Sequence, residues 1–351
     1  MDAIVLHACG GPERLQFEAR EPPNARPGWV VVKVHAEGVC YRDIVERRGG
    51  FAFIKQPVVP GHEWAGEIVE VGAGVIDFAI GDRVVNLHRA ACGACEACRR
   101  GHETRCRAAL EVFGLSVDGG YAQLVAAPVG CLVRLPLEIP YAAACFLNCT
   151  AGVALRALRS VARVAQGERV LVTGASGGVG AHAIQIAKVL GAHVIAATSS
   201  DAKRGSLRDL GADTVVVSTA ADLHRAVKRE TAGTGVDVVL DCVGTPTLNA
   251  SLRSLRAGGR LVVVGNVTSD RWEVNPGFVI LAELQIMGSA GCNRDDLEQV
   301  LAWVAQGRVR PIIAEQLPLS AAAEAHRRLE RQGVTGRIVL LPWADPTEAA
   351  K

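Results

Sequence analysis

The sequence predicts an α/β fold made of a β-rich domain and a second domain with a doubly wound parallel sheet. Three observations support this prediction. The chain has 351 residues, which is long enough for two hydrophobic cores. Residues 1–38 contain strand-like alternation and turns, whereas from residue 169 onward short apolar runs alternate with helical patterns. Between these regions, glycines at three-residue spacing stand where a strand turns into a helix.

The junction of that strand and helix carries the clearest motif. The apolar run 170–173 is followed by Gly174, Gly177 and Gly180, and then by apolar residues at helical spacing up to Gly191. Glycines there let the backbone approach a pyrophosphate, and the helix N-terminus offers free N–H groups. The residues predicted to bind a dinucleotide at this turn are Gly174, Ser176, Gly177, Gly178, Val179 and Gly180.

A glycine-rich turn alone is equally compatible with dinucleotide binding and with a tight turn that binds nothing. The elements that follow it in the sequence decide between these two alternatives. Strand-like runs alternate with helical patterns, at 193–197, 214–217, 236–241, 260–264 and 281–289. This alternation predicts a parallel sheet of six strands and favours dinucleotide binding. A helix is predicted over 294–306 and a last strand over 334–341. Because six strands already complete the sheet, we expect the last strand to join the first domain.

The end of the second strand of this sheet predicts which dinucleotide binds. Sites for NAD place an acidic residue there, which accepts a hydrogen bond from the ribose 2′-hydroxyl. Here hydroxyl side chains end the strand and cations follow within one turn: Thr198, Ser199, Ser200, Lys203 and Arg204. Hydroxyls and cations suit a 2′-phosphate, so NADP(H) is predicted in preference to NAD(H). Asp201 is the nearby acid, and we interpret it as the N-cap of the next helix.

Composition restricts the other classes of partner. The formal net charge of +2 gives no electrostatic basis for binding nucleic acid or an acidic membrane surface. The longest small and apolar run, 141–155, is too short and too polar to span a bilayer. Met1 leads directly into strand-like alternation, so no signal peptide is expected and the protein is predicted to be cytoplasmic.

Four of the 11 cysteines form a metal-binding pattern. Cys92, Cys95, Cys98 and Cys106 have the spacing C-x2-C-x2-C-x7-C. Four thiolates complete a tetrahedral site around Zn²⁺, so a structural zinc is predicted in a lobe at about residues 88–110. Four unrelated thiols are the alternative, which this spacing disfavours. A zinc finger that reads DNA is disfavoured by the nearly neutral chain and by the dinucleotide domain.

Three residues far apart in the sequence are candidate ligands of a second zinc. Cys40 follows a strand, His62 stands in a Pro-Gly-His-Glu sequence, and Cys149 precedes a helical run. Thiolate and imidazole groups together suit zinc. Spacing does not decide between such a site and the alternatives of buried thiols and a structural histidine. Cys145 lies one helical turn before Cys149 and is a candidate core thiol.

These motifs together resemble those of the zinc-containing medium-chain dehydrogenase/reductase family, which includes the alcohol dehydrogenases. The resemblance covers essentially the whole chain. It implies a GroES-like catalytic domain formed by residues 1–150 and 291–351, a Rossmann domain formed by 151–290, and an active site in the cleft between them. It also implies two Zn²⁺ per chain, a small-molecule substrate, and a homo-oligomer (dimer or tetramer), commonly formed by pairing Rossmann edge strands.

The resemblance assigns roles to the candidate metal ligands and their neighbours. It implies that Cys40, His62 and Cys149 hold a catalytic zinc. It implies that Glu63 is a carboxylate able to approach the same metal. Asp43, three residues after Cys40, corresponds to the group that orients His62.

The resemblance also assigns roles in cofactor binding. Arg337 matches a basic residue that reaches the cofactor pyrophosphate. Val243, Val264 and Asn266 match residues that pack and orient the ribose on the nicotinamide side. The glycine turn with three-residue spacing is typical of the NADPH-using quinone reductase branch of the family, in agreement with the predicted cofactor.

The implied activity is hydride transfer between a nicotinamide and an alcohol or carbonyl substrate polarised by the catalytic zinc. One feature departs from the alcohol dehydrogenases. They usually carry Ser or Thr two residues after the first zinc cysteine, and often His three residues further on, as a proton relay. Arg42 and Val45 occupy these positions. Valine cannot carry a proton and arginine is always charged, so Tyr41 or a water chain would have to replace the relay.

The departure supports an alternative activity. The segments around Cys40, the glycine turn, Val243 and Gly265 resemble the archaeal acryloyl-CoA reductase branch of the same family, which reduces a conjugated C=C bond with NADPH. A CoA substrate needs cations for its phosphates, and Arg47, Arg48 and Lys55 are candidates, with an ordinary solvated face as the alternative. A non-catalytic NADP-binding protein is a third hypothesis, which the intact set of zinc ligands disfavours.

Overall fold

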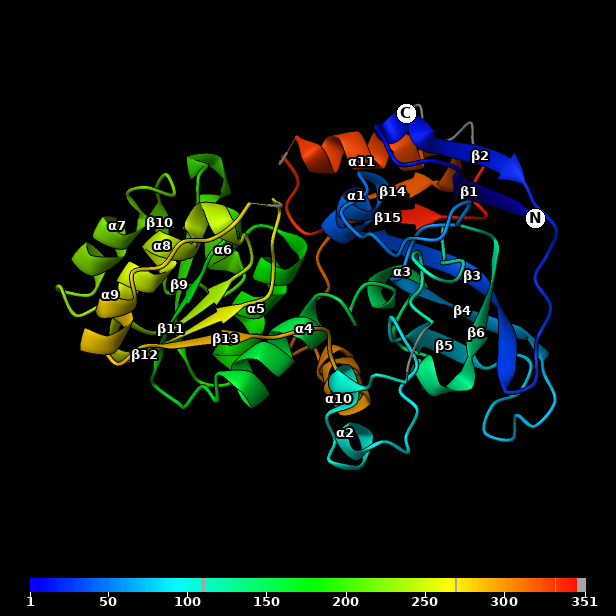
Figure 1. The fold of residues 1–351 in the computed structure, drawn as a ribbon, viewed down its shortest axis with the longest axis horizontal. Helices are drawn as coiled ribbons and strands as arrows, with labels where there is room; N and C mark the ends of the chain where they lie inside the picture. Colours follow the sequence, from blue (N-terminus) through cyan, green and yellow to red (C-terminus); the bar gives the residue numbers. More distant parts are fainter. Residues whose placement is uncertain (109–110, 269, 332, 346–351) are drawn as a thin grey trace. The chain divides into compact units, whose positions relative to one another are not determined.

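The computed structural model describes residues 1–108, 111–268, 270–331 and 333–345, and the chain divides into two compact units (Figure 1). Unit 1 comprises Met1–Cys149, Cys292–Ala305 and Pro311–Lys351. Unit 2 comprises Thr150–Gly291 and Gln306–Arg310. The last two positions of the predicted zinc lobe, 109 and 110, lie outside the described residues.

Strands dominate unit 1. Its seven-stranded sheet has the order β14-β15-β3-β4-β5-β7, with β6 paired to β3, and β1 and β2 form a separate antiparallel pair. The strands are β1 (Asp2–Leu6), β2 (Leu15–Ala19), β3 (Trp29–Val39), β4 (Trp64–Val71), β5 (Arg83–Asn86), β6 (Leu124–Pro128), β7 (Leu132–Arg134), β14 (Ile313–Pro318) and β15 (Arg337–Leu341). The long β3 is the centre of this sheet because it pairs with β15, β4 and β6.

The helices of unit 1 are short. They are α1 (Tyr41–Arg47), α2 (Glu96–Arg99), α3 (Tyr141–Ala144), α10 (Arg294–Ala305) and α11 (Ala322–Glu330). The helix predicted over 294–306 is confirmed as α10. Neither β14 nor α11 was predicted from the sequence. In β14 the first four residues are half-buried or exposed, and the strand ends in a proline, so it lacks a clear strand pattern.

The last strand joins unit 1, as predicted. β15 pairs antiparallel with β3, placing Ile338 opposite Val39 and Leu340 opposite Glu37. Ile338 and Leu340 are fully buried in a core that also holds residues of β1, α11 and Tyr121. The C-terminal segment therefore closes the sheet that begins near the N-terminus.

Unit 2 contains the predicted parallel sheet. Its strand order is β10-β9-β8-β11-β12-β13, and every pairing is parallel. The strands are β8 (Arg169–Val172), β9 (His193–Thr198), β10 (Thr214–Val217), β11 (Val236–Asp241), β12 (Leu255–Val263) and β13 (Gln285–Gly288). β13 begins later than predicted because residue 281 still belongs to the preceding helix.

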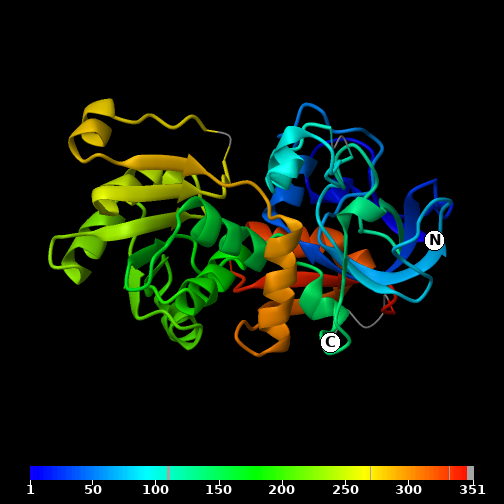
Figure 2. The same ribbon diagram turned by 90° about the horizontal axis from the view of Figure 1, so that it is seen from below.

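The strands of unit 2 alternate with helices. These are α4 (Ala151–Leu155), which continues into a π-helical segment (Arg156–Val161), α5 (Gly178–Val189), α6 (Arg204–Asp209), α7 (Leu223–Glu230), α8 (Thr245–Ser254) and α9 (Pro276–Leu281). α4 packs against α5 and α7 against α8, and Figure 2 shows the green helices α4 and α5 together on one side of the strands. No helix within the described residues has both the length and the apolar character needed to cross a lipid bilayer.

One local prediction at the end of β9 is wrong. Ser200, not Asp201, occupies the N-cap position of the short 3-10 turn Asp201–Lys203 that precedes α6. The carboxylate of Asp201 instead accepts a hydrogen bond from Arg204 Nε at 3.0 Å. An i, i+3 ion pair within the first turn competes with capping for the same carboxylate.

Candidate active site

The start of α1 positions Cys40. Cys40 is the N-cap of this helix, immediately after β3, and its backbone N–H donates to Asp43 Oδ2 at 2.8 Å. A carboxylate three residues into a helix satisfies the free N–H of the N-cap in this way. Local helix geometry therefore fixes Asp43 beside Cys40, and both side chains are buried.

The Asp43 carboxylate gathers three hydrogen-bond donors. Besides Cys40 N, His62 Nδ1 lies 2.9 Å from Oδ1, and the Tyr121 hydroxyl donates to Oδ2 at 3.1 Å. An ionised carboxylate only accepts, so the hydrogen-bond network assigns the His62 proton to Nδ1. The lone pair on His62 Nε2 is then free for a metal, as the predicted orienting role of Asp43 requires.

Two amide side chains fix the backbone of His62. Asn86 at the end of β5 and Asn148 beside Cys149 both donate through Nδ2 to the His62 carbonyl, at 2.9 and 3.2 Å. Asn86 Oδ1 also accepts from the Trp64 backbone at 2.9 Å. Neither asparagine was predicted from the sequence as a functional residue. Asn148 directly precedes a predicted ligand, which was a usable signal, but the position of Asn86 at the end of a strand was not.

The three predicted ligands of the catalytic zinc lie together in unit 1. The sulfur atoms of Cys40 and Cys149 are 3.9 Å apart, and Cys149 Sγ is 3.6 Å from His62 Nε2. Tetrahedral zinc with Zn–S and Zn–N bonds of about 2.3 and 2.05 Å separates two sulfurs by about 3.8 Å and a sulfur and a nitrogen by about 3.6 Å. The donor atoms therefore fit a tetrahedral zinc ion.

Glu63 completes this cluster. Its ligand atom lies within 4.8 Å of those of Cys40, His62 and Cys149. Oε1 accepts from Arg337 Nη2 at 2.7 Å, whereas Oε2 is buried with no hydrogen-bond partner among the residues that the structure describes. A buried carboxylate oxygen without a partner beside two thiols and an imidazole suits a cation. The structure thus pairs Arg337 with Glu63, and its role toward the cofactor pyrophosphate stays a prediction.

A glycine in β3 makes room for that carboxylate. A Cβ atom at Gly38 would lie 2.3 Å from Glu63 Oε2 and 2.9 Å from Phe146 Cβ. Any larger residue would therefore displace the Glu63 side chain from the cluster.

Burial and neighbouring charges tune the protons of this cluster. Burial raises the pKa of Glu63 to about 8, although the Arg337 cation opposes the shift. Burial and Arg42 oppose ionisation of His62, but the Asp43 carboxylate raises the pKa of this imidazole well above its usual range. The contact with Cys149 lowers the pKa of the Cys40 thiol. Zinc binding here would release protons from thiol and imidazole groups, because ligands bind metal in their deprotonated forms.

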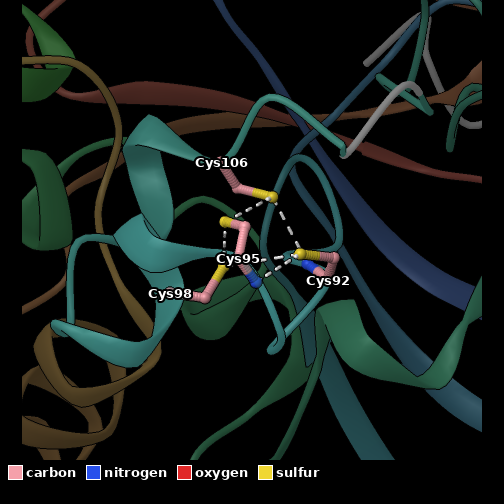
Figure 3. A group of neighbouring side chains, drawn as sticks. All are labelled: Cys92, Cys95, Cys98 and Cys106. Carbon is pink, nitrogen blue, oxygen red and sulfur yellow. Dashed lines mark hydrogen bonds between the residues drawn. The ribbon is translucent and has the colours of Figure 1, made fainter.

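The four clustered cysteines also converge. Figure 3 shows the sulfur atoms of Cys92, Cys95, Cys98 and Cys106 turned toward a common centre, with separations of 3.4 Å for Cys95–Cys98 and 3.9 Å for Cys92–Cys98 and Cys95–Cys106. These distances are close to the edge of about 3.8 Å expected for four sulfurs around zinc. The backbone N–H of Cys92 lowers the pKa of Cys106 to about 6. All four positions are occupied by protein, which suits a structural zinc.

Hydrogen bonds hold this lobe to the start of α10. Thr104 N donates to Asn293 Oδ1 at 3.2 Å, and Asn293 Nδ2 donates to the carbonyl of Gly101 at 2.9 Å. Arg294 N donates to Glu103 Oε2 at 3.1 Å. The metal-binding lobe is therefore anchored within unit 1 by the segment that re-enters this unit after β13.

The glycine turn of unit 2 has the geometry of a phosphate-binding loop. Gly174 has a φ of +58°, Gly177 is the N-cap of α5, and a Cβ atom at Gly180 would lie 2.3 Å from the Gly174 carbonyl oxygen. The first turn of α5 can pack against the end of β8 only because residue 180 has no side chain. Its free N–H groups are therefore available to an anion.

Two predicted parts of the cofactor site meet beside this turn. Lys203 Nζ donates to Ser176 Oγ at 3.2 Å, although the residues are 27 positions apart. Ser200 N donates to Thr198 Oγ1 at 3.2 Å, which orders the turn after β9. The predicted cation thus lies at the edge of the glycine turn. Ser199 is exposed next to this group.

The residues predicted on the nicotinamide side follow β11 and β12. A Cβ atom at Gly174 would lie 3.0 Å from Val243 Cγ2, so Val243 is packed against the glycine turn. Val264 N donates to the Asp241 carbonyl at 2.9 Å, which joins the ends of the two strands. Asn266 Oδ1 lies 2.6 Å from where a Cβ atom of Gly244 would be. All three residues therefore gather at the carboxyl ends of the parallel strands, where such sheets bind ligands.

Arg42 occupies the position of the missing proton relay. Its Nε is 2.5 Å from Glu46 Oε1, one helical turn away, and its Nη2 donates to the Phe113 carbonyl at 3.2 Å. Burial raises the pKa of Glu46 to about 8, against the effect of Arg42. Arg42 is thus engaged by the buried carboxylate of Glu46 and by a backbone carbonyl, while 22% of its own side chain is exposed.

Two of the three candidate cations for a CoA substrate lie beside Glu330. Arg47 is buried, donates to the Gly10 carbonyl at 2.9 Å and pairs with Glu330. Arg48 Nη2 lies 2.8 Å from the same carboxylate. Glu330 offsets one of these two positive charges, and the Arg48 side chain is 53% exposed. Lys55 is exposed outside this network, so a contact of Arg48 or Lys55 with CoA phosphates stays a prediction.

Comparison with known proteins identifies both halves of the chain. Residues 26–137 match the family model described as alcohol dehydrogenase GroES-like domain, and residues 178–306 match the model described as zinc-binding dehydrogenase. The acryloyl-coenzyme A reductase of Metallosphaera sedula is 38% identical over 97% of this chain and 99% of its own. An alcohol dehydrogenase of Geobacillus stearothermophilus is 35% identical over 93% of this chain and 95% of its own.

A solved structure extends the comparison to three dimensions. The crystal structure of AibC superposes with a TM-score of 0.92 at 43% sequence identity, over 98% of this chain and 96% of that one. The GroES-like fold of unit 1 and the Rossmann fold of unit 2 are therefore those of a known family, and the fold predicted from the sequence is confirmed.

Removing one thiolate of the four-cysteine cluster should release one zinc. Replacing Cys95 with serine is expected to lower the zinc content of purified protein by one ion per chain and to lower the melting temperature, because a structural zinc contributes to folding. Zinc is measured by atomic emission and unfolding by calorimetry. The control is Cys9→Ser, since Cys9 lies outside both clusters. Equal zinc contents in the two variants would contradict a metal at this lobe.

A side chain at Gly180 should disrupt the dinucleotide site. Gly180→Ala is expected to weaken dinucleotide binding by about tenfold or more, equivalent to about 1.4 kcal/mol, because the Cβ atom forces α5 away from the glycine turn. Fluorescence titration with NADPH measures the affinity. Gly205→Ala is the matched control, since a Cβ atom there meets nothing within 4 Å. Unchanged affinity in Gly180→Ala would exclude this turn as the binding site.

Proposed function

The chain belongs to the zinc-containing medium-chain dehydrogenase/reductase family, and from that premise we propose that it is a zinc-dependent NADP(H) oxidoreductase acting on an alcohol or carbonyl substrate. The observation that supports this proposal most strongly is the cluster of Cys40, His62 and Cys149. Its donor atoms have the spacing of a tetrahedral zinc ion with three protein ligands. Three ligands leave one position for substrate, which is typical of a catalytic zinc.

The residues around this cluster prepare it for such chemistry. When bound, zinc would supply a Lewis acid for the substrate oxygen. Asp43 holds the proton of His62 on Nδ1, and Arg337 keeps one oxygen of Glu63 engaged while the other stays free. When bound, the nicotinamide cofactor would supply hydride for the carbonyl carbon in reduction and accept it in oxidation.

The preference for NADP(H) rests on the end of β9. This strand ends in Thr198 without an acidic residue, and Lys203 reaches Ser176 at the glycine turn. Asp201 is largely exposed and pairs with Arg204, so its charge is offset. A 2′-phosphate would find a cation and hydroxyl groups here.

A compound with a conjugated C=C bond is the second candidate substrate. The ion pair of Arg42 with Glu46 occupies the usual place of the alcohol proton relay. A relative that is 38% identical carries the name acryloyl-coenzyme A reductase. In that reaction hydride would pass to the β-carbon and a proton to the α-carbon, so no hydroxyl proton has to leave through a relay.

We also propose that the chain forms a homo-oligomer through the edge of the sheet in unit 2. β13 is the last strand of that sheet, so one side of its backbone has no neighbouring strand within the described chain. Apolar side chains are exposed on β13 and the adjacent α9: Phe278 (37%), Ile280 (72%), Leu281 (88%) and Ile286 (39%). An exposed edge with apolar neighbours suits pairing with a second copy.

The proposed function is tested by removing one catalytic ligand. Cys40→Ala is expected to lose one zinc per chain and to lower NADPH oxidation to the level of a control without protein, while the four-cysteine zinc remains. Cys145→Ala is the control, because this buried thiol donates to the Ala142 carbonyl outside the cluster. Initial rates with acryloyl-CoA and with simple aldehydes separate the two candidate substrates. Retained activity together with two zinc ions would refute the proposal.

The cofactor preference should depend on Lys203. Lys203→Ala is expected to raise the Kd for NADPH by about 10-fold to 100-fold and to leave NADH binding nearly unchanged, because a hydrogen bond to a charged group contributes about 1.5–3 kcal/mol. Both affinities are measured by fluorescence titration. The control is Lys188→Ala, whose ammonium pairs with Asp213. Equal losses for both cofactors would contradict a 2′-phosphate contact.

The proposed oligomer should depend on β13. Ile286→Glu is expected to shift the protein toward the monomer in analytical ultracentrifugation, because it places a charge in the apolar edge. Ile76→Glu introduces the same charge at a 91% exposed position of unit 1 and should leave the mass unchanged. An unchanged mass for Ile286→Glu would exclude this edge as the interface.

A further inference from the structure

A chain of buried polar side chains extends from the candidate zinc site into the core of unit 1. His62 Nδ1 lies 2.9 Å from Asp43 Oδ1, the Tyr121 hydroxyl lies 3.1 Å from Asp43 Oδ2, and His326 Nε2 lies 3.0 Å from the same hydroxyl. All four side chains are at most 1% exposed. They come from four separate segments of the chain, and neither Tyr121 nor His326 was singled out from the sequence as a functional residue.

The hydrogen atoms along this chain can be assigned. The Asp43 carboxylate only accepts, so the single hydroxyl hydrogen of Tyr121 points to Asp43. His326 Nε2 must then carry a hydrogen and donate it to the Tyr121 oxygen. Burial lowers the pKa of His326 to about 4, so this imidazole is neutral, and its Nδ1 has no partner in the described part of the chain. Each bond in the series therefore points toward Asp43.

A second contact fixes the helix that supplies His326. His326 and Glu330 lie one turn apart on α11, and Glu330 pairs with Arg47 at the end of α1. α1 also carries Asp43, and Figure 1 shows α11 beside it. The distance between α1 and α11 is thus set at two points, which limits how far Tyr121 can move from Asp43.

Packing alone does not explain these polar groups. Tyr121 and His326 lie in or against a core of aliphatic side chains, and their rings meet edge to face at 5.9 Å. Phenylalanine at either position would fill much the same space and would bury no polar group. A buried hydroxyl or imidazole that lacks a hydrogen-bond partner costs about 1–3 kcal/mol. The polar chain leads to one place, the carboxylate that holds Cys40 and His62.

We propose that Tyr121 and His326 are positioning residues of the zinc site, which hold Asp43 and, through it, Cys40 and His62 in the arrangement that retains the metal. This inference rests on the proposed function, because it requires zinc at Cys40, His62 and Cys149. Residues outside the ligand set contribute to metal retention by restricting the ligands before the metal binds.

The proposal predicts a selective effect on one zinc. Tyr121→Phe removes the hydroxyl and leaves Asp43 Oδ2 with the Cys40 backbone N–H. Zinc should then leave the catalytic site about tenfold faster, the lower end of the range for groups that support metal ligands. The four-cysteine zinc should leave at the wild-type rate, so each protein carries its own internal control.

Two variants of His326 test its place in the series. His326→Phe keeps a ring and removes the donor, so it should accelerate zinc loss from the catalytic site. His326→Gln keeps an N–H donor and should restore much of the wild-type rate. The double variant Tyr121→Phe/His326→Phe should behave like Tyr121→Phe alone, because His326 acts only through the hydroxyl. Additive effects would contradict this series.

The experiment follows zinc transfer from the full-length protein to a chromogenic chelator in a stopped-flow instrument. Cys40→Ala and Cys95→Ser, which each lack one zinc, assign the two kinetic phases. Tyr141→Phe is the matched control, because this tyrosine stacks on His35 at 4.4 Å. Melting temperatures identify variants that are destabilised as a whole. If Tyr121→Phe folds poorly, the comparison of His326→Phe with His326→Gln still tests the proposal.

The outcomes separate this inference from the proposed function. Faster release of only the catalytic zinc in Tyr121→Phe and His326→Phe, with rescue in His326→Gln, supports the inference. Wild-type release rates in both Phe variants, or equal acceleration of both phases, overturn it while the zinc site stands. A wild-type protein that holds zinc only at the four-cysteine lobe overturns the proposed function and the inference with it.

Discussion

The Asp43 carboxylate is the group on which the candidate active site depends. It accepts hydrogen bonds from the Cys40 backbone, the His62 ring and the Tyr121 hydroxyl, so one buried side chain joins a helix N-terminus, a loop before β4 and the turn before β6. The pairing of β3 with β4 brings these segments together, and Asp43 then joins the Cys40 backbone to the His62 ring. Burying this carboxylate without partners would be costly, and the three hydrogen-bond donors offset that cost.

The two metal clusters are built on different principles. The four cysteines of the lobe lie within fifteen residues, so the local chain brings them together and needs only its attachment to α10. The proposed catalytic ligands come from residues 40, 62 and 149, and tertiary structure must assemble them. Local assembly leaves no open position and suits a structural ion. The cluster of Cys40, His62 and Cys149 offers two thiolates and one imidazole, which would leave one position for substrate.

The fold class and the parallel sheet could be predicted because alternating apolar runs and glycines at fixed spacing are local signatures. Clustered cysteines are a local signature as well. Cys40, His62 and Cys149 share no spacing, so their roles came from the family resemblance, and both ligand assignments stay predictions. Tyr121, His326 and Asn86 were not predicted, because their roles come from hydrogen bonds between segments that no spacing connects. Asn148 was not predicted either, although its place beside Cys149 was a usable signal. The pairing of Arg47 and Arg48 with Glu330 could not be predicted, since Glu330 lies 282 or more residues away in the sequence.

Zinc-edge anomalous diffraction from crystals of the purified protein tests the central claim most directly, because it locates each metal without reference to activity. The account predicts two peaks per chain, one enclosed by Cys92, Cys95, Cys98 and Cys106 and one bounded by Cys40, His62 and Cys149. A single peak at the four-cysteine lobe, with Cys40 and Cys149 free or joined to each other, would contradict it.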